Sequence, residues 1–348
     1  MTSKNENKEL ELALAQIEKQ FGKGTIIDST HFVNQDIEVI PTGSYAMDKA
    51  LGVGGLPAGR ITEIFGGEGL GKSLMALCLT ANAQKEGHKV LYVDAEHDLD
   101  PTWAKFIGVD MEKLLIHQPE DGEQALEVAH TLIKTGAVKL VIIDSVAAMT
   151  PRNIIEGNMD QSTVAELPRL FSKALSKMRG DIKKTETVFV LLNQIRDKIG
   201  FMQSGVESPG GRAIKFYSSV RIKLVRTGDL IEGGEVVGTK IKAKTLKNKV
   251  ASPHKECSYN IVDGFGFDNY ADIIDDAVDL GIVIKKGTWF YLPEINKETG
   301  EIEKGKAIGN GYRKIREVLS NDNEMTQMLL DEIKVRQSPI LTTEEESA

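Results

Sequence analysis

The sequence predicts an α/β fold in which a mostly parallel sheet carries helices on both of its faces. From Arg60 onward, short apolar runs alternate with helical stretches, which is the pattern of βαβ units. The first of these runs ends in glycines and leads straight into a helical stretch, and a later run ends in the single carboxylate of Asp144. Both features are typical of an α/β sheet that binds a nucleotide at its carboxyl edge.

Length and composition limit the class of protein. The chain has 348 residues, which suits about two domains, and its 41% hydrophobic and 27% charged residues are typical of a globular protein. Its two cysteines are too few for a disulfide framework or a zinc cluster, and they predict reduced thiols. The N-terminus is polar, and no apolar run approaches the ~18 residues of a membrane span. We therefore expect a cytoplasmic protein that does not enter a membrane.

The first predicted element is an amphipathic helix over residues 8–21. Its apolar positions Leu10, Leu14, Ile17 and Phe21 are spaced by 4, 3 and 4 residues and form one stripe, and glycines follow it. The stripe needs a partner. The sequence leaves open whether the partner is the helix's own domain or a neighbouring subunit.

The central part of the chain predicts the sheet and its helices. Strands are expected over 61–65, 89–93, 138–143 and 187–192, and helices over 72–86, 123–134 and 165–184. The stretches 151–164 and 195–211 break this pattern and are rich in Gly, Asn, Ser and Pro. Loops of this length inside a domain are usually functional or disordered.

The next part of the chain is locally basic. Residues 212–255 hold eleven basic and three acidic side chains, a net charge of +8 against −8 for the whole chain. This asymmetry indicates a surface for a polyanion, although one solvated lysine face on a sheet would give the same count. Strands are expected over 221–225 and 240–250, with a turn-rich stretch at 227–234. Helices at 270–280, 312–319 and 325–335 and a strand at 288–292 then predict a small second domain, followed by an acidic tail.

A phosphate-binding loop is the most specific motif. The residues that fit G-x-x-x-x-G-K-[ST] are Gly66, Gly67, Glu68, Gly69, Leu70, Gly71, Lys72 and Ser73. Glycines let successive backbone N–H groups face phosphate oxygens, and the following helix directs its positive end at them. Lys72 is expected to neutralise the β and γ phosphates of a nucleoside triphosphate. Ser73 and Asp144 are expected to hold Mg²⁺.

A second carboxylate site follows the strand over 89–93. Asp94 and Glu96 share one side of an extended chain, and Glu96 is our candidate for the general base that polarises an attacking water. Two solvated strand-end acids are the alternative. Asp100 and Trp103 come shortly after and are candidate nucleotide contacts, because an aromatic ring can stack on a base. A lone Trp is more often part of a core.

These residues, in this order, resemble the bacterial RecA recombinase family. The resemblance runs from about Leu14 to about residue 320 and is strongest in six blocks, at residues 16–24, 94–97, 143–148, 193–196, 215–217 and 247–249. It implies an N-terminal helix and linker for oligomerisation (1–33), a RecA-like P-loop NTPase core (34–268), a small α/β C-terminal domain (269–334) and an acidic tail (335–348).

The resemblance also assigns roles to residues. Lys247 and Lys249 match the pair that reaches the γ-phosphate on a neighbouring subunit, Gln194 links that phosphate to the second DNA loop, and Phe216 plugs a neighbour. Loops 151–164 and 195–211 match the two DNA-binding loops. The implied DNA contacts are Ser162, Arg169, Arg196, Lys198, Ile199, Gly210, Gly211 and Arg212.

The implied function is that of a DNA-dependent ATPase that forms a filament on single-stranded DNA and exchanges strands with a homologous duplex. Recombination, DNA repair and a part in the SOS response through a LexA-like repressor follow from it. Two alternatives stay open: a hexameric ring helicase, which would normally supply an arginine finger instead of Lys247 and Lys249, and a non-enzymatic filament that only promotes repressor self-cleavage.

Some residues depart from the usual family pattern. In the phosphate loop these are Gly67, Gly69, Leu70 and Ser73. Trp103 stands where Tyr is usual, Asp197 puts an acid between two basic residues of the second loop, and Val164 is a shorter apolar residue in the first. An acid at Asp197 weakens the attraction of phosphate locally. The departures suggest a divergent copy, such as one from a phage or another mobile element.

Overall fold

The computed structural model describes residues 2–22, 25–26, 37–157, 165–195, 209–295 and 302–337. The chain divides into two compact units, Met1–Glu38 and Val39–Ala348. The first unit holds helix α1 (Thr2–Phe21), which starts six residues before the predicted helix and ends where the sequence predicts. Its Leu10, Leu12 and Phe21 are all more than half exposed within this chain.

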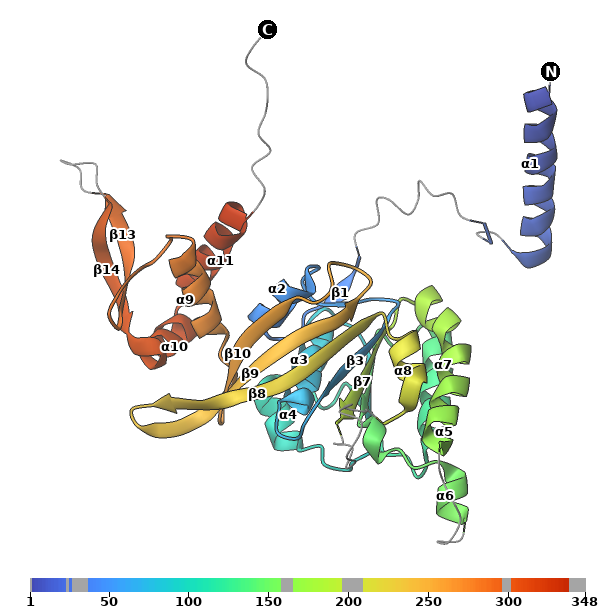
Figure 1. Cartoon of the computed structure of the whole chain (residues 1–348), viewed down its shortest axis with the longest axis horizontal. Helices are drawn as coiled ribbons and strands as arrows, with labels where there is room; N and C mark the ends of the chain where they lie inside the picture. Colours follow the sequence, from blue (N-terminus) through green and yellow to red (C-terminus); the bar gives the residue numbers. More distant parts are fainter. Residues whose placement is uncertain are drawn as a thin grey trace, which may run out of the picture. The chain divides into compact units, whose positions relative to one another are not determined.

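The second unit is built on a nine-stranded sheet (Figure 1). The strand order is β11-β10-β9-β8-β3-β7-β6-β4-β5. All pairs from β8 to β5 are parallel, and β9, β10 and β11 continue the sheet in antiparallel fashion. The mostly parallel sheet predicted from the sequence is therefore confirmed. The strands are β3 (Ile61–Gly66), β4 (Val90–Asp94), β5 (Leu114–His117), β6 (Leu140–Asp144), β7 (Val188–Gln194), β8 (Val220–Glu232), β9 (Glu235–Asn248), β10 (Glu256–Val262) and β11 (Gly266–Phe267).

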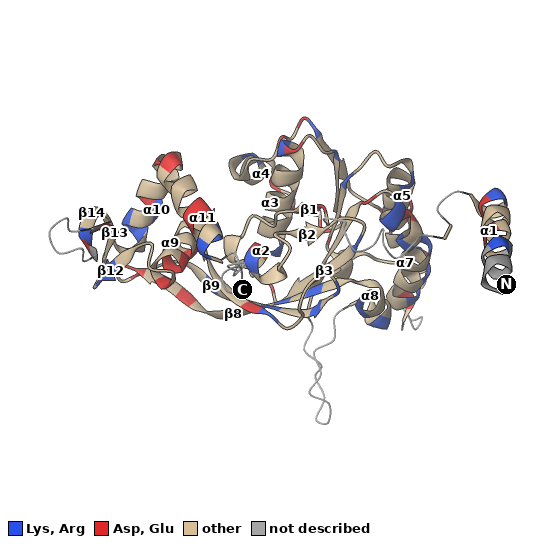
Figure 2. Ribbon diagram, turned by 90° about the horizontal axis from the view of Figure 1, so that it is seen from above, with Lys and Arg blue, Asp and Glu red and all other residues tan. Residues whose placement is uncertain are grey.

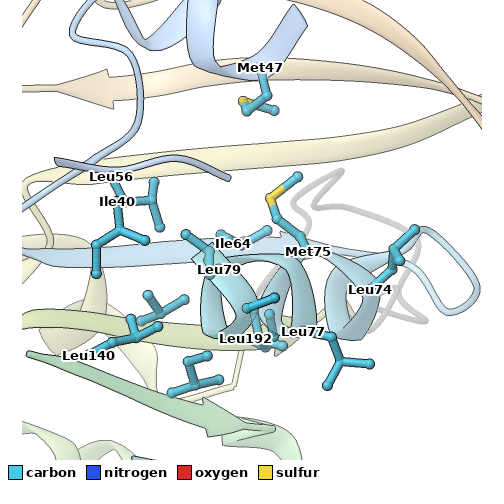
Figure 3. Packing of buried hydrophobic residues seen from close by; sticks show 14 of the residues in the cluster. Ile40, Met47, Leu56, Ile64, Leu74, Met75, Leu77, Leu79, Leu140 and Leu192 are labelled. Atoms are coloured by element: carbon cyan, nitrogen blue, oxygen red, sulfur yellow. The ribbon is translucent and has the colours of Figure 1, made fainter. Parts of the chain in front are cut away.

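Helices cover both faces of this sheet, and each face has its own apolar cluster. Successive strand residues point to opposite faces, so in β6 Leu140 belongs to one cluster and Val141 to the other. Figure 3 shows the first cluster, in which Met75 and Leu79 of α3 pack on the strands. The first face carries α3 (Lys72–Lys85) and α4 (Pro101–Ile107), and the second carries α5 (Gly122–Thr135), α7 (Glu166–Lys184) and α8 (Gly211–Tyr217).

Shorter elements complete the core. The pair β1 (Val39–Ile40) and β2 (Leu56–Pro57) flanks α2 (Tyr45–Leu51), and a 3₁₀ turn over Val146–Ala148 follows β6. Helix α6 (Arg152–Glu156) occupies part of the stretch that the sequence predicts as a loop. Among the described residues, no helix combines the length and the apolar character needed to cross a bilayer.

The hairpin of β8 and β9 differs from its prediction. Residues 227–232, expected in a turn, continue β8, and the turn itself is only Gly233 and Gly234, with φ of +63° and +89°. A two-residue hairpin turn of this kind needs positive φ at both positions, so the two glycines suffice. The polar residues before them still pair with β9, across register shifts.

Three basic residues of β9, Lys240, Lys242 and Lys244, lie at every second position, so they share one face of the strand. Figure 2 marks them in blue. Lys242 and Lys244 both pair with Glu256 of β10, at 2.6 and 2.8 Å. Part of the positive charge expected to attract a polyanion is therefore neutralised within the chain.

A small α/β subdomain follows the sheet. It contains α9 (Asn269–Asp279), the antiparallel strands β12 (Ile284–Lys286), β13 (Trp289–Ile295) and β14 (Ile302–Asn310), and helices α10 (Gly311–Asn321) and α11 (Asn323–Gln337). Its own apolar cluster includes Ile274, Phe290 and Ile315. Strand β14 was not predicted. Arg316 joins the subdomain to the hairpin, because it donates hydrogen bonds to Glu232 at 2.9 Å and Asp268 at 2.6 Å.

A buried carboxyl on α9 predicts how stability depends on pH. Burial, together with Asp268 and the other acids nearby, raises the pKa of Asp272 from 3.8 to about 8. Between these values the folded chain holds a proton that the unfolded chain releases, so stability falls as pH rises from about 4 to about 8. Asp272→Asn should make this slope shallower in urea unfolding followed across that range. The exposed Asp279→Asn serves as control and should keep the wild-type slope.

Candidate nucleotide site and its surroundings

The phosphate loop joins β3 to α3 in the arrangement that the motif predicts. Gly71 directly precedes α3 with φ of +72°, a conformation that glycine adopts readily, and a side chain there would strike Ile261. A Cβ on Gly66 would lie 2.7 Å from the carbonyl oxygen of Leu224. Steric constraints as well as phosphate chemistry therefore require glycine at both positions.

Lys72 lies inside the curl of this loop. It is 9% exposed, and its Nζ donates to the carbonyl oxygens of Gly67 at 2.5 Å and Gly66 at 3.4 Å. Burial lowers the pKa of Lys72, while the carboxylates of Asp144 and Glu96 act in the opposite direction. Leu70 is buried in the first apolar cluster, whereas Gly67, Glu68, Gly69 and Ser73 lie at or near the surface, where a nucleotide can reach them.

Asp144 ends β6 beside the loop. The hydroxyl of Tyr92 donates to its Oδ2 at 2.6 Å. Burial raises the pKa of Asp144, and hydrogen bonds with Tyr92 and Ser73 oppose the rise. A hydroxyl and a carboxylate are hard oxygen donors, which suit Mg²⁺. No group of three His, Cys, Asp or Glu residues in the described part of the chain could hold a metal ion, and Mg²⁺ usually takes one or two carboxylates together with substrate phosphates.

Glu96 follows β4 and faces the ends of two neighbouring strands. Its Oε1 accepts hydrogen bonds from the Ser145 hydroxyl and from Nε2 of Gln194, the latter at 3.1 Å. Glu96 is thus held between the residue after β6 and the last residue of β7. Because these strands are parallel, their carboxyl ends bring the three side chains to one edge.

Asp94, the last residue of β4, makes contacts that differ from those of Glu96. The extended strand ends at Asp94, and its carboxylate accepts hydrogen bonds from the backbone of Asp98 at 3.2 Å and from Gln118 at 2.9 Å. The period of two ceases to apply once the chain leaves the strand. Asp94 therefore organises the following turn, and Glu96 alone reaches toward Gln194.

Asp100 and Trp103 lie at the start of α4. Asp100 caps the helix by accepting from the backbone N–H of Thr102 at 2.7 Å and of Trp103 at 3.2 Å. The half-buried ring of Trp103 stacks on Phe106 with 5.1 Å between ring centres. One face of the indole is therefore covered by the chain's own aromatic residue.

The predicted DNA contacts are only partly described. Ser162, Arg196, Lys198 and Ile199 lie outside the described residues, as do Val164 and Asp197. Arg169 and Arg212 are both exposed. A Cβ on Gly211 would lie 3.0 Å from Pro168, so the starts of α7 and α8 meet. Because of this contact, Arg169, Arg212 and Gly210 lie close together at the starts of α7 and α8.

Lys247 and Lys249 lie toward the other end of the sheet. Lys247 pairs with Arg221, which is level with Glu63 of β3, and Gly66 is three residues further along that strand. At about 3.3 Å per residue this places the backbone of Lys247 ~10 Å from the level of the phosphate loop. The Nζ of Lys247 instead donates to the carbonyl oxygens of Lys215 at 2.9 Å and Phe216 at 3.0 Å.

A basic hollow surrounds this lysine pair. It has a volume of about 470 Å³, and its charged lining residues are Arg60, Arg179, Lys183, Lys247 and Lys249, with no acid among the described residues that line it. Burial, followed by the charges of Lys249 and Arg221, lowers the pKa of Lys247. Phe216 is at the rim and is 69% exposed.

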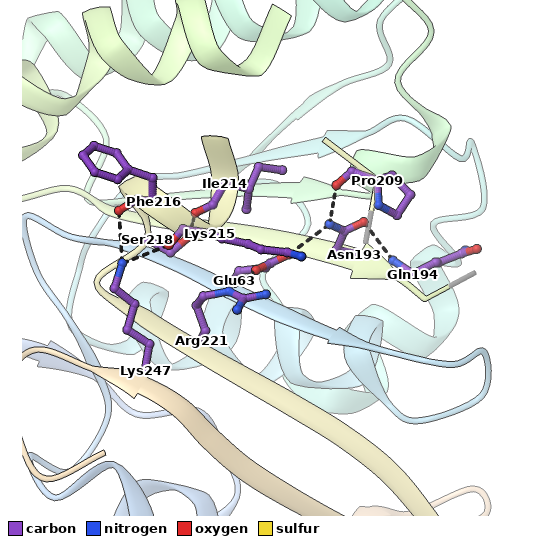
Figure 4. A network of polar contacts seen from close by, with 10 residues as sticks. All are labelled: Glu63, Asn193, Gln194, Pro209, Ile214, Lys215, Phe216, Ser218, Arg221 and Lys247. Carbon is purple, nitrogen blue, oxygen red and sulfur yellow. Dashed lines mark hydrogen bonds and ion pairs between the residues drawn. The ribbon is translucent and has the colours of Figure 1, made fainter. Parts of the chain in front are cut away.

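Sequence reasoning missed several side chains that hold this arrangement together. Tyr92 and Ser145 contact the two carboxylates, and Glu63, Asn193 and Arg221 form a buried network behind Gln194 (Figure 4). The one available signal was Glu63 itself, the single charged residue of a buried strand. The partners of these side chains are distant in sequence, so no local pattern marks them.

Known proteins resemble this chain along nearly its whole length. A family model for the RecA N-terminal domain matches residues 8–268. The protein RecA of Aquifex aeolicus is 45% identical over 334 residues, which cover 95% of this chain and 92% of that protein. The protein RecA of Symbiobacterium thermophilum is 44% identical over 344 residues, which cover 98% of this chain and 96% of that protein. The protein RecA of Ruminococcus albus is 49% identical over 289 residues, which cover 83% of this chain and 73% of that protein.

The hydrogen bond from Tyr92 to Asp144 gives a test of the nucleotide site. Tyr92→Phe removes a donor from a buried carboxylate, and such a bond contributes about 1.5–3 kcal/mol. We expect the affinity for Mg·ATP to fall by roughly tenfold or more, measured by equilibrium titration with a fluorescent nucleotide. Tyr259→Phe is the matched control, because the Tyr259 hydroxyl is equally buried but has no hydrogen-bond partner among the residues that the structure describes. Equal affinities of the two variants would contradict this role of Tyr92.

Proposed function

This chain belongs to the RecA family, and we propose that each of its subunits binds Mg·ATP at the phosphate loop and completes the site of a neighbour with Lys247 and Lys249. As a member of this family it is a DNA-dependent ATPase and a strand-exchange recombinase that acts in recombination and DNA repair. It binds single- and double-stranded DNA and forms filaments. Of the functions that the sequence left open, family membership favours the recombinase.

The observation that carries the proposal is the meeting of four strand ends. Lys72 follows β3, Glu96 follows β4, Asp144 ends β6 and Gln194 ends β7. In the proposed reaction Lys72 neutralises phosphate charge, and Glu96 accepts a proton from the attacking water. Ser73 and Asp144 would hold Mg²⁺, which supplies positive charge to the phosphate oxygens.

Contacts of Glu96 suggest how DNA controls turnover. Ser145 and Gln194 both donate to the same carboxylate oxygen of Glu96, so this oxygen already accepts two hydrogen bonds from the protein. Gln194 leads directly into the proposed second DNA loop at 195–211. We infer that DNA on this loop withdraws Gln194 toward the γ-phosphate and frees Glu96 to act as a base.

DNA is proposed to lie along the edge that carries Arg169, Gly210, Gly211 and Arg212, together with Ser162, Arg196, Lys198 and Ile199 of the two loops. Arginines among glycines bind phosphates without reading bases, so little sequence preference is expected. Affinity should decrease steeply with salt.

The neighbouring subunit is proposed to meet the basic hollow. Lys247 and Lys249 are too far along the sheet to serve their own phosphate loop, and the exposed Phe216 provides an apolar contact beside them. The exposed apolar stripe of α1 would pack on another subunit. Asp100 and Trp103 are proposed to border the nucleotide base.

Further parts of the proposal rest on the family alone. They are a role with a LexA-like repressor in the SOS response, control of duplex access by the C-terminal domain and acidic tail, and the division of the chain at residues 33, 268 and 334. The cytoplasm is the proposed compartment, in keeping with the free thiols of Cys78 and Cys257. Origin from a phage or another mobile element likewise remains a proposal.

Steady-state ATPase assays with and without single-stranded DNA test the proposed coupling. The wild-type protein should turn over slowly alone and much faster with DNA, because the DNA releases Glu96. Glu96→Gln should bind ATP normally but lose roughly 10²–10⁴ in DNA-stimulated rate, the usual contribution of a general base. Lys72→Ala should lose turnover through loss of phosphate charge. Equal wild-type rates with and without DNA would refute the coupling.

Mixing two inactive variants tests the lysines in trans. Lys247→Ala/Lys249→Ala should lose about 10²-fold or more in stimulated turnover if the pair stabilises charge on a neighbour's γ-phosphate. A 1:1 mixture with Lys72→Ala should regain activity at roughly a quarter of the junctions, where an intact loop meets intact lysines. No recovery in filaments verified by microscopy would assign the lysines to their own subunit.

A further inference from the structure

Glu63 is a carboxylate at the centre of the sheet. It lies in β3, between β7 and β8, and its side chain is 0% exposed. A buried charge is costly unless it is paired and hydrogen-bonded. Glu63 is both: its Oε1 accepts from Nδ2 of Asn193 at 3.0 Å, and its Oε2 accepts from Nε of Arg221 at 2.6 Å. One carboxylate therefore bridges the two strands that flank β3 (Figure 4).

The Asn193 branch leads to the nucleotide and DNA side. Nδ2 of Asn193 also donates to the carbonyl oxygen of Pro209 at 2.9 Å, and its Oδ1 accepts from the backbone N–H of Gln194 at 3.0 Å. Asn193 thus ties together both ends of the proposed second DNA loop. Gln194 in turn contacts Glu96.

The Arg221 branch leads to the basic hollow that is proposed to face a neighbouring subunit. Arg221 is 13% exposed, and its guanidinium lies 4.7 Å from the centre of the Phe65 ring. In the backbone register of β8 and β9, Arg221 lies opposite Lys247. The Nζ of Lys247 donates to the carbonyl oxygens of Lys215 and Phe216 in α8. A change in the position of Arg221 therefore acts on the strand pair that carries Lys247.

We propose that Glu63 is a positioning residue. It fixes the position of the carboxyl end of β7, which leads into the proposed DNA loop, relative to the part of β8 and β9 that carries Arg221 and Lys247. Charge-assisted hydrogen bonds are short and directional, and both branches share one buried carboxylate, so neither can move without the other. Because Glu63 is fully buried, a nucleotide or DNA at the surface would not touch it. This inference rests on the proposed coupling between DNA and turnover, and it concerns how efficiently that coupling works.

Glu63→Gln is the first test, because it keeps the shape and removes the charge. The expected result is a fall of about tenfold or more in the ratio of DNA-stimulated to unstimulated turnover, within the usual range of coupling between sites. Affinity for ATP and the unstimulated rate should stay within about twofold of wild type. Thr62→Val is the matched control, because Thr62 is equally buried on the opposite face of β3 and its hydroxyl has no hydrogen-bond partner within the described part of the chain. The ratio should not change in this variant.

A double variant separates positioning from simple stability. Glu63→Gln leaves Arg221 without its counter-charge and should lower the melting temperature. Glu63→Gln/Arg221→Gln removes the unpaired charge, and replacing both partners of a buried pair is far less costly than removing one. We expect the double variant to regain thermal stability and remain poorly stimulated by DNA. Recovery of the stimulation ratio together with stability would overturn the proposal, because Glu63 would then be only structural.

The same assays distinguish the two levels of inference. A wild-type protein without DNA stimulation would remove the proposed coupling, whatever Glu63 does. A stimulated wild type with an equally stimulated Glu63→Gln variant, both folded by circular dichroism, would leave the coupling intact and refute the positioning role.

Discussion

The parallel register of four central strands is the constraint on which the nucleotide site depends. Asp94 pairs with Asp144, and Gly66 pairs with Gln194. Because these strands all run the same way, side chains at or just beyond their last residues converge on one edge. A slip of one residue in any strand would turn its side chains to the other face of the sheet. The site therefore inherits its geometry from the packing of the two apolar clusters.

The antiparallel part of the sheet has the opposite effect. Strand β9 runs back alongside β8. Its carboxyl end, which carries Lys247, therefore lies level with the amino-terminal part of β3. The phosphate loop and the pair Lys247 and Lys249 are thus separated along the strands, although both belong to one continuous sheet. The hydrogen bonds of Glu63 to Asn193 and Arg221 connect the strands between them. Because these bonds are buried, water does not weaken them by screening.

Local chemistry decided how much could be predicted from the sequence. The phosphate loop, the strand before Asp144 and most helices follow from spacing and glycine patterns, and the structure agrees with them. The strand period that was applied to Asp94 and Glu96 does not extend to Glu96, because β4 ends at Asp94 and the chain bends after it. The turn at 227–234 was wrong because two glycines suffice for the hairpin. The roles of Asn193, Ser145 and Arg221 could not be found, since the carboxylates that their side chains contact are 49 to 158 residues away.

The separation of the phosphate loop from the lysine pair makes any assembly built on them polar. Each copy would offer a different surface at its two ends, so successive copies join head to tail, and such contacts extend indefinitely unless the rotation closes a ring. The two terminal subunits of such an assembly then expose different surfaces. At one terminus a nucleotide site lacks the lysines of a neighbour, and at the other a lysine pair has no nucleotide to serve. Hydrolysis and loss of subunits would consequently proceed at different rates from the two tips.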